Sequence, residues 1–248
     1  MKILLAPSET KVLGGEGRFD VANLFFKALH PKQQRLIEHY NDTLLQASNE
    51  TLSTMLGIKK LDEIAVYRQD ITSLPTLKAI ERYSGVAFDY LDYTSLEPLP
   101  QKYIHEHLVL FSNLFGILKP DDLIPYYKLK QAQSISEIKT DRYYSEAITE
   151  ILDSYLKNEE LLDIRAGYYD KFYKPKIPYT TLKFIQNGKV VSHWAKAYRG
   201  KVLRLLALYQ INTLEDFMRL EIENLTIKEI CTLKNQTQIV YTITGESK

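Results

Sequence analysis

The sequence holds one cysteine, Cys231, and no long apolar run. A single cysteine excludes an intramolecular disulfide and favours a reducing compartment. The first apolar stretch ends at Pro7, so it is shorter than the roughly 7–15 apolar residues of a signal-peptide core. No segment approaches the ~20 apolar residues that a membrane-spanning helix needs. We therefore expect a soluble cytoplasmic protein that does not interact with a membrane.

Net charge and metal ligands are also scarce. The 248 residues carry a formal net charge of +1, so only a local concentration of charge could attract a nucleic acid. The five histidines are scattered, and one cysteine cannot make a cysteine-rich zinc site. The G-x-G-x-x-G and G-K-S/T patterns of nucleotide-binding loops are absent. We therefore expect neither a metal site nor a cofactor.

Short apolar runs predict the strands of an α/β protein. Several are almost continuous in apolar residues, as are strands buried on both faces of a sheet. Asn187-Gly188 supplies the two positive φ angles of a tight hairpin turn, and a second hairpin is expected around residues 234–236. The predicted strands are residues 2–6, 108–111, 161–165, 177–186, 189–192, 225–233 and 238–243.

Helical periodicity and prolines predict the segments between these strands. Pro31 is expected to separate two helices because it lacks an N–H donor. A loop is expected around Pro98 and Pro100, and a turn at residues 112–120. The predicted helices are residues 20–48 (divided at Pro31), 75–82, 141–157, 168–173, 192–209 and a short helix capped by Thr213.

The composition and the absence of linkers predict one domain. Hydrophobic residues make up 45% of the chain and charged residues 25%, which are the proportions of an ordinary globular protein. The sequence has no internal repeat and no low-complexity segment. We expect residues 1–248 to form a single compact domain of mixed α/β class, with a mixed sheet flanked by helices.

Residues 52–65 read as a helix, a tight turn at Gly57 and Ile58, and a second helix. Such an arrangement can present the free N–H groups of the second helix to a phosphate, together with Lys59 and Lys60. An ordinary turn between two helices is the alternative. On this pattern alone the ordinary turn is favoured over a contact with DNA.

Polar side chains follow the first predicted strand directly. They are Ser8, Glu9, Thr10 and Lys11. Sheets of α/β proteins bind their ligands at the carboxyl ends of strands. These residues are therefore candidates for a binding site.

Residues 165–204 form a strongly basic segment. It carries ten Lys or Arg residues against one acid, Asp170, whereas residues 141–163 carry seven acids against two bases. Within residues 191–204, helical spacing puts Lys196 and Arg199 on one face. Such a segment attracts polyanions through its local field. We favour one wall of an anion-binding cleft, and a solvated helix face is the alternative.

Six blocks of the sequence match a pattern known from one family. The two most specific are SNLFGILKPDDLIPYYKL at Ser112–Leu129, similar to S-G-L-Y-G-L-L-R-P-x-D-L-I-x-x-Y-R-L, and VSHWAKAYRGKVLR at Val191–Arg204, similar to I-S-x-x-A-K-x-A-R-G. The others are Ile3–Lys11, Met55–Ala65, Gly85–Leu91 and Asp163–Tyr173. In their order and spacing these blocks resemble the YaaA family of peroxide stress proteins over nearly the whole chain.

The resemblance implies a compact mixed α/β fold with a positively charged cleft and a helix-hairpin-helix-like element. It also implies binding to duplex and branched DNA, and protection from peroxide by limiting free iron. Matched residue by residue, the implied cleft residues are Lys196, Arg199, Gly200, Lys119, Tyr127 and Lys128, and the implied hairpin residues are Gly57, Ile58, Lys59 and Lys60.

The sequence departs from the family pattern at four positions within the matched blocks. Glu9 stands where many members carry lysine, which puts an anion in place of a cation in the expected cleft. Asn113 replaces the usual glycine. Asp163 and Arg165 stand where the family has asparagine and a small residue.

Two functions follow from these observations. The first is a DNA-binding stress protein without sequence preference, in which about four to six cations contact phosphates and affinity falls with salt. Ser8, Thr10 and Arg165 would add to its anion site. The alternative is an enzyme acting on a phosphorylated or anionic small molecule, with Glu9 or Asp163 as base and Lys196 and Arg199 holding the charge. The chain shows no recognisable nucleophile motif, so DNA binding without catalysis is favoured.

Overall fold

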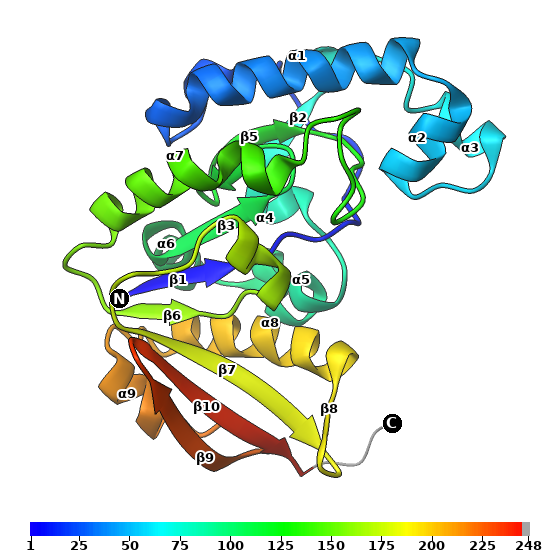
Figure 1. Cartoon of the computed structure of the whole chain (residues 1–248). Coiled ribbons are helices and arrows are strands. Elements are labelled where there is room, and N and C mark those ends of the chain that lie inside the picture. The colour runs from blue at the N-terminus through cyan, green and yellow to red at the C-terminus, as the bar shows by residue number, and fades with distance from the viewer. Residues whose placement is uncertain (245–248) are drawn as a thin grey trace.

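The computed structural model describes residues 1–244 and contains a central sheet of eight strands (Figure 1). The strand order is β4-β3-β1-β6-β7-β10-β9, and β8 pairs with β7. The five strands from β3 to β10 are parallel, and β4, β8 and β9 are antiparallel to their neighbours. The bounds are β1 Lys2–Leu5, β3 Leu108–Ser112, β4 Gly116–Leu118, β6 Leu161–Asp163, β7 Tyr179–Gln186, β8 Lys189–Val190, β9 Leu225–Leu233 and β10 Gln236–Ile243. A separate antiparallel pair consists of β2 Thr76–Lys78 and β5 Leu123–Pro125.

The middle of the sheet is buried on both faces. Every residue of β3 and β6 is buried, and Ile3, Leu4 and Leu5 of β1 are at most 1% exposed. In the register of the sheet, Leu4 lies between Val109 and Asp163. Parallel strands end at the same edge of a sheet, so the residues that follow β1, β3 and β6 come together there.

Helices pack around this sheet. Helix α8 contacts β7, α5 and α6, whereas α7 contacts β4 and the 3-10 helix η5. Figure 1 shows α1 and α2 at one end of the molecule and β9 and β10 at the other. The helices are α1 His30–Gln46, α2 Asn49–Leu56, α3 Leu61–Ala65, α4 Ala79–Arg82, α5 Val86–Leu91, α6 Pro98–His107, α7 Thr140–Tyr155, α8 Ser192–Leu208 and α9 Leu214–Arg219, with 3-10 helices η1 Val21–Asn23, η2 Lys27–Leu29, η3 Ile71–Ser73, η4 Tyr93–Ser95 and η5 Gly167–Lys171. The predicted mixed α/β class is confirmed.

Several local predictions are confirmed in detail. Asn187 and Gly188 adopt φ angles of 51° and 75° in the turn between β7 and β8. Thr213 caps α9, because its Oγ1 accepts a hydrogen bond from the Asp216 N–H at 3.0 Å. These features were predictable because a turn or a cap depends on neighbours within three residues.

The predictions that rested on proline were wrong in two places. Pro31 lies in the first turn of α1, and residues 20–29 contain only the 3-10 helices η1 and η2 where a helix was expected. Pro98 opens α6, where a loop was expected. Both corrections have the same reason. The N–H groups in the first turn of a helix have no acceptor within the helix, so proline loses no hydrogen bond there.

Two further corrections involve strand pairing. The turn predicted at residues 112–120 contains β4, which pairs with β3. Gly116 makes the reversal at φ 76°, and the Tyr144 ring lies 3.1 Å from where its Cβ would be. Residues 75–82 divide between β2 and α4, because Thr76–Lys78 pairs with the distant β5. Neither pairing is visible in the local pattern of residues.

Candidate functional site

A cavity of about 470 Å³ lies where the central parallel strands end. We call it the central cavity. Its wall combines residues that follow β1, β3 and β6 with residues from α5 and α8. Those that bear on its chemistry are Ser8, Glu9, Thr10, Asn113, Gln131, Ala166, Tyr169, Lys196 and Arg199. The structure thus brings the polar residues after the first strand together with the two cations predicted on one helix face.

Lys196 and Arg199 are the cations of the central cavity. Lys196 is exposed and Arg199 is partly buried. In residues 1–244 neither side chain has an ion-pair or hydrogen-bond partner, and the Arg199 Nε is buried without one. Burial lowers the pKa of Arg199, and the charge of Asp163 partly offsets this. A guanidinium nitrogen that is buried without a hydrogen-bond acceptor costs free energy unless an anion binds there.

Glu9 is the only carboxylate in the wall of the central cavity within the described part of the chain. Its Oε1 accepts a hydrogen bond from the backbone N–H of Gln131 at 3.0 Å. Glu9 therefore ties the loop at residues 128–131 to the end of β1 and forms no ion pair with Lys196 or Arg199. The cavity keeps an excess of positive charge although lysine is replaced at this position.

The hydroxyl groups of Ser8 and Thr10 hold the loop after β1 against the start of α5. The Thr10 Oγ1 donates to the Ser84 carbonyl at 2.9 Å and lies 3.0 Å from the Ser8 Oγ. Gly85, at φ 96°, faces both hydroxyls, since a Cβ there would lie 2.7 Å from the Thr10 Oγ1. Ser8 and Thr10 line the cavity, but their hydroxyls already serve to position its wall.

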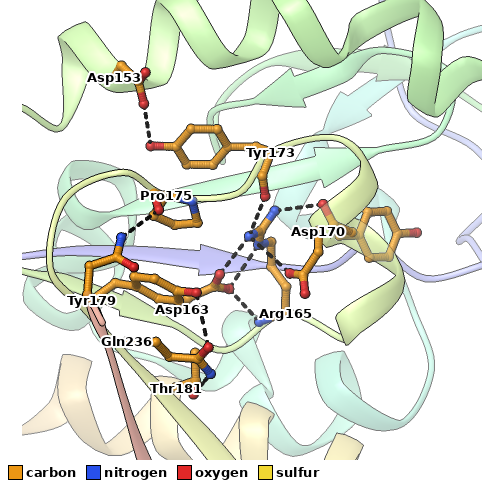
Figure 2. Close-up of polar contacts among 11 residues, drawn as sticks. Asp153, Asp163, Arg165, Asp170, Tyr173, Pro175, Tyr179, Thr181 and Gln236 are labelled. Carbon is orange, nitrogen blue, oxygen red and sulfur yellow. Dashed lines mark hydrogen bonds and ion pairs between the residues drawn. The ribbon is translucent and has the colours of Figure 1, made fainter. Parts of the chain in front are cut away.

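Asp163 and Arg165 form a closed pair beside the central cavity. The Arg165 Nε and Nη2 donate to the two Asp163 carboxylate oxygens at 2.8 and 2.6 Å. Its Nη2 also donates to the Tyr173 carbonyl oxygen at 3.0 Å (Figure 2). Its Nη1 donates to the Tyr169 carbonyl oxygen, also at 3.0 Å. The Arg165 side chain is 1% exposed. Arg165 was predicted to bind an anion, but in the structure it is satisfied by the protein, and both oxygens of Asp163 are occupied.

A smaller cavity of about 220 Å³ lies between α8 and the strands β6, β7 and β10, and we call it the side cavity. Asp163, Arg165 and Arg199 contribute to its wall, and so do Lys183 and Gln238. Arg199 is the residue that lines both cavities within the described chain. Its guanidinium therefore stands at the junction between them.

Lys119, Tyr127 and Lys128 do not line the central cavity. The Lys119 Nζ donates to the Leu108 carbonyl at 2.9 Å, and burial lowers its pKa to about 8. The buried Tyr127 hydroxyl lies 2.8 Å from that of Tyr83. Lys119 and Tyr127 thus have structural partners in the core that the sequence pattern could not reveal.

Lys11 packs just behind the end of β1. Its Nζ donates to the backbone carbonyls of Ser8 and Glu9 at 3.1 and 3.2 Å and lies 4.1 Å from the centre of the Tyr127 ring. Burial lowers its pKa to about 7, and the nearby charge of Lys128 acts in the same direction. Lys11 therefore supports the loop whose residues line the cavity.

Two short helices flank the turn at Gly57, as the sequence predicted. Gly57 ends α2 at φ 68°, Ile58 is buried, and Lys59 and Lys60 are exposed. Lys59 and Lys128 line a shallow surface hollow beside this turn. The side chain of Lys130 covers Gly57, since a Cβ there would lie 2.7 Å from its Cδ. The loop at residues 128–131 thus connects the turn with the central cavity, where Gln131 lies.

Gly200 serves helix packing. A Cβ at this position would lie 2.0 Å from the Ala87 carbonyl oxygen of α5. The glycine lets α8 approach α5 closely, which brings the Lys196 and Arg199 face of α8 to the cavity wall that α5 forms. The missing side chain of Gly200 thus allows a close contact with the backbone of α5.

The acids that neutralise the basic segment come from elsewhere in the chain. The Lys176 Nζ lies 2.7 Å from Asp153 of α7, and the Arg204 Nη1 lies 3.6 Å from Asp92. Counting charges within residues 165–204 therefore overstated the free charge of this segment. The unpaired cations lie on the cavity face of α8, where Lys196 is exposed and Arg199 is partly buried.

The sequence predicted some of the residues that line the central cavity and missed others. Asn113 follows β3 as Ser8 follows β1, so the rule about strand ends would have included it as a site residue. Gln131, Ala166 and Tyr169 come from loops whose folding depends on distant contacts, and nothing local marked them as site residues.

Residues 1–244 contain neither a cluster of metal ligands nor a membrane-spanning helix. Across residues 1–244, no group of three or more His, Cys, Asp or Glu residues is arranged to hold a metal ion. No helix in that range has both the length and the apolar character to cross a membrane.

Comparison with known proteins gives consistent matches along the chain. A family model described as "Peroxide stress protein YaaA" matches residues 1–230. An uncharacterized protein of Campylobacter jejuni is 41% identical over 231 residues, which cover 93% of this chain and 94% of the relative. A UPF0246 protein of Corynebacterium glutamicum is 34% identical over 230 residues, covering 88% of this chain and 90% of the relative. A UPF0246 protein of Fusobacterium nucleatum is 25% identical and covers 95% and 97%.

Proposed function

The chain belongs to the YaaA family of peroxide stress proteins, and we propose that it acts in the oxidative-stress response by binding DNA at the central cavity, thereby limiting iron-driven damage. The observation that carries this proposal is the pair Lys196 and Arg199, two cations on one helix face without a partner in the described chain. DNA phosphates are anions that such groups bind through charge-assisted hydrogen bonds.

The turn at Gly57 supports a second contact with the same DNA. Its exposed Lys59 and Lys60 are joined to the central cavity by the loop at residues 128–131. The Lys130 N–H donates to the Met55 carbonyl at 3.0 Å, which fixes the loop to α2. A DNA strand that contacts both places would meet several lysines that are held by one rigid connection.

The geometry favours binding over catalysis. An enzyme would need a free base near the bound anion. The Glu9 carboxylate holds the Gln131 N–H, and the Asp163 carboxylate holds Arg165. Both Asp163 oxygens are thus engaged by Arg165, and one Glu9 oxygen is engaged by the Gln131 N–H.

Titration of duplex and four-way-junction DNA at two salt concentrations tests the proposal. We expect affinity at low salt that falls steeply with added salt. Lys196→Ala should weaken binding to all sequences alike and reduce the salt slope by about 1, the value expected for one lost phosphate contact. Lys59→Ala tests the turn in the same way.

Lys102→Ala is the matched control, since Lys102 is an exposed lysine of α6 that lies 3.8 Å from Glu106. It should leave affinity and slope unchanged. Absence of binding at low salt, or equal effects of Lys196→Ala and Lys102→Ala, would refute the proposal. Peroxide survival of cells that carry only the Lys196→Ala protein then tests whether the DNA contact serves the stress response.

A further inference from the structure

We propose that the central cavity receives a single nucleoside 5′-phosphate unit, with its phosphate on Lys196 and Arg199 and its base inside. The unit comes either from an unpaired nucleotide of a DNA chain or from a free mononucleotide. This inference rests on the proposed DNA binding and specifies which part of the DNA the cavity holds.

The size of the cavity selects a nucleotide over a double helix. A volume of about 470 Å³ lies within the range of small-molecule sites. A cube of that volume is about 8 Å on a side, whereas the major groove of a duplex alone is about 12 Å wide. Paired DNA can therefore lie across the opening, and only a nucleotide that has left its stack can enter.

The wall has the mixture of surfaces that a base needs. A base offers flat faces for apolar and aromatic contact and a polar edge for hydrogen bonds. Val86, Phe88, Ala166 and Tyr169 supply apolar and aromatic surface. The Asn113 Oδ1 accepts a hydrogen bond from the Tyr169 hydroxyl at 3.1 Å. This contact fixes the orientation of the amide and leaves its NH₂ group as a donor to the edge of a base.

The position of Arg199 suits a phosphodiester that links the bound nucleotide to the next nucleotide of a DNA strand. Arg199 lines both the central and the side cavity, so a phosphate on its guanidinium has space on two sides, as a phosphodiester requires. In the side cavity Lys183 and Gln238 have no side-chain partner within residues 1–244. They can meet the sugar-phosphate of the next nucleotide.

The experiment fills the cavity and varies the DNA. Ala166→Leu adds a larger apolar side chain to the wall at an extended backbone position (φ −77°, ψ 144°) that any residue adopts. Ala22→Leu, at an exposed alanine of η1, is the control for the added hydrophobicity. The ligands are a duplex, the same duplex with one bulged 2-aminopurine nucleotide, the same bulge with an abasic residue, and free deoxynucleoside 5′-monophosphate.

We expect the wild-type protein to bind the bulged duplex about tenfold more tightly than the paired and abasic duplexes, since the latter two offer no unpaired base to contact the cavity wall. The 2-aminopurine fluorescence should change on binding. Ala166→Leu should abolish both the preference and the fluorescence change, so that the bulged, abasic and paired duplexes bind with similar affinity. Ala22→Leu should behave as the wild type does.

Failure of this inference is distinct from failure of the proposed function. Equal binding of all three DNA forms, with no fluorescence change and no binding of the mononucleotide, would overturn the inference and leave DNA binding standing. Binding of the free mononucleotide that Ala166→Leu abolishes, without binding of any DNA, would support the cavity assignment, identify the free nucleotide as its source and overturn DNA binding.

Discussion

Arg165 donates two hydrogen bonds to Asp163 at 2.8 and 2.6 Å, and the two side chains are 1% and 5% exposed. The same guanidinium donates to the carbonyl of Tyr173 (Figure 2). It also donates to the carbonyl of Tyr169, so one side chain fixes the end of β6 to the 3-10 helix η5. That helix carries Tyr169 into the wall of the central cavity. The pair therefore shapes the site from behind while Arg199 stays free inside it.

Removal of Arg165 should destabilise the whole domain. Arg165→Met leaves the Asp163 carboxylate buried without its partner, and breaking a buried pair in this way costs about 3–5 kcal/mol. The free energy of unfolding, measured in urea, should fall by that amount.

Arg219→Met is the control, because Arg219 pairs with Glu215 on the surface of α9. An exposed pair contributes about 0–1 kcal/mol. Similar losses for the two variants would show that the buried pair contributes no more than a surface contact.

A methyl group at Gly200 should separate α8 from α5. Its Cβ would lie 2.0 Å from the Ala87 carbonyl oxygen and 3.0 Å from the Leu91 N, so one of the helices must shift. Overpacking of this kind costs about 1–3 kcal/mol. Gly200→Ala should lower the free energy of unfolding by that amount and should weaken DNA binding, because the shift moves the cation face of α8.

Gly167→Ala separates this effect from the general cost of replacing glycine. A Cβ at Gly167 meets nothing within 4 Å, and its φ is not in the left-handed region. The unfolding free energy of Gly167→Ala should stay within about 0.5 kcal/mol of the wild-type value. If Gly200→Ala were equally neutral, the close helix contact would not hold in solution.

The sequence predicted the elements whose signals are local. The run of apolar residues at 108–111 could only be a buried strand or a buried helix, and the Asn187-Gly188 turn permits a hairpin and little else. The strand-end rule likewise placed Ser8, Glu9 and Thr10 at the cavity. In each case the physical cause lies within a few residues of the feature.

The missed features depend on contacts between distant segments. The pairing of β2 with β5 joins residues 76 and 125, and no periodicity carries that information. Arg165 was expected to bind an anion because its charge was counted along the chain, whereas its actual partners are Asp163 and two carbonyls reached by the turn into η5. Counting charged residues along the sequence gives the number of cations in a segment, but it does not show which of them lack an acidic or carbonyl partner in the fold.

Replacement of Arg199 should make the protein more stable and less able to bind. The free protein holds this guanidinium partly buried, with its Nε unsatisfied, and burial lowers its pKa. Arg199→Met fills similar space without a charge, so the free energy of unfolding should rise by about 0.5–2 kcal/mol. DNA affinity at low salt should fall.

Lys196→Met provides the comparison, because Lys196 is exposed. It should weaken DNA binding while leaving the unfolding free energy within about 0.5 kcal/mol. A loss of stability in Arg199→Met would show that Arg199 has a structural partner in the free protein and is not an unsatisfied cation available to an anion.

Lys11 should make stability rise with pH above neutrality. Burial lowers its pKa in the folded protein to about 7 from the usual 10.5. Between these two values the unfolded chain binds a proton that the folded protein does not, so the free energy of unfolding increases with pH. Below pH 7 both states are protonated and the full cost of burying the charge is present.

Lys11→Met removes this titration. The difference in urea midpoint between the wild type and Lys11→Met should therefore shift in favour of the wild type when the pH is raised from 7 to about 9.5. Lys27→Met, at an exposed lysine of η2, should show the same difference from the wild type at both pH values. A Lys11→Met difference that does not change with pH would mean that the Lys11 amine remains charged in the folded protein, held by the Ser8 and Glu9 carbonyls and the Tyr127 ring.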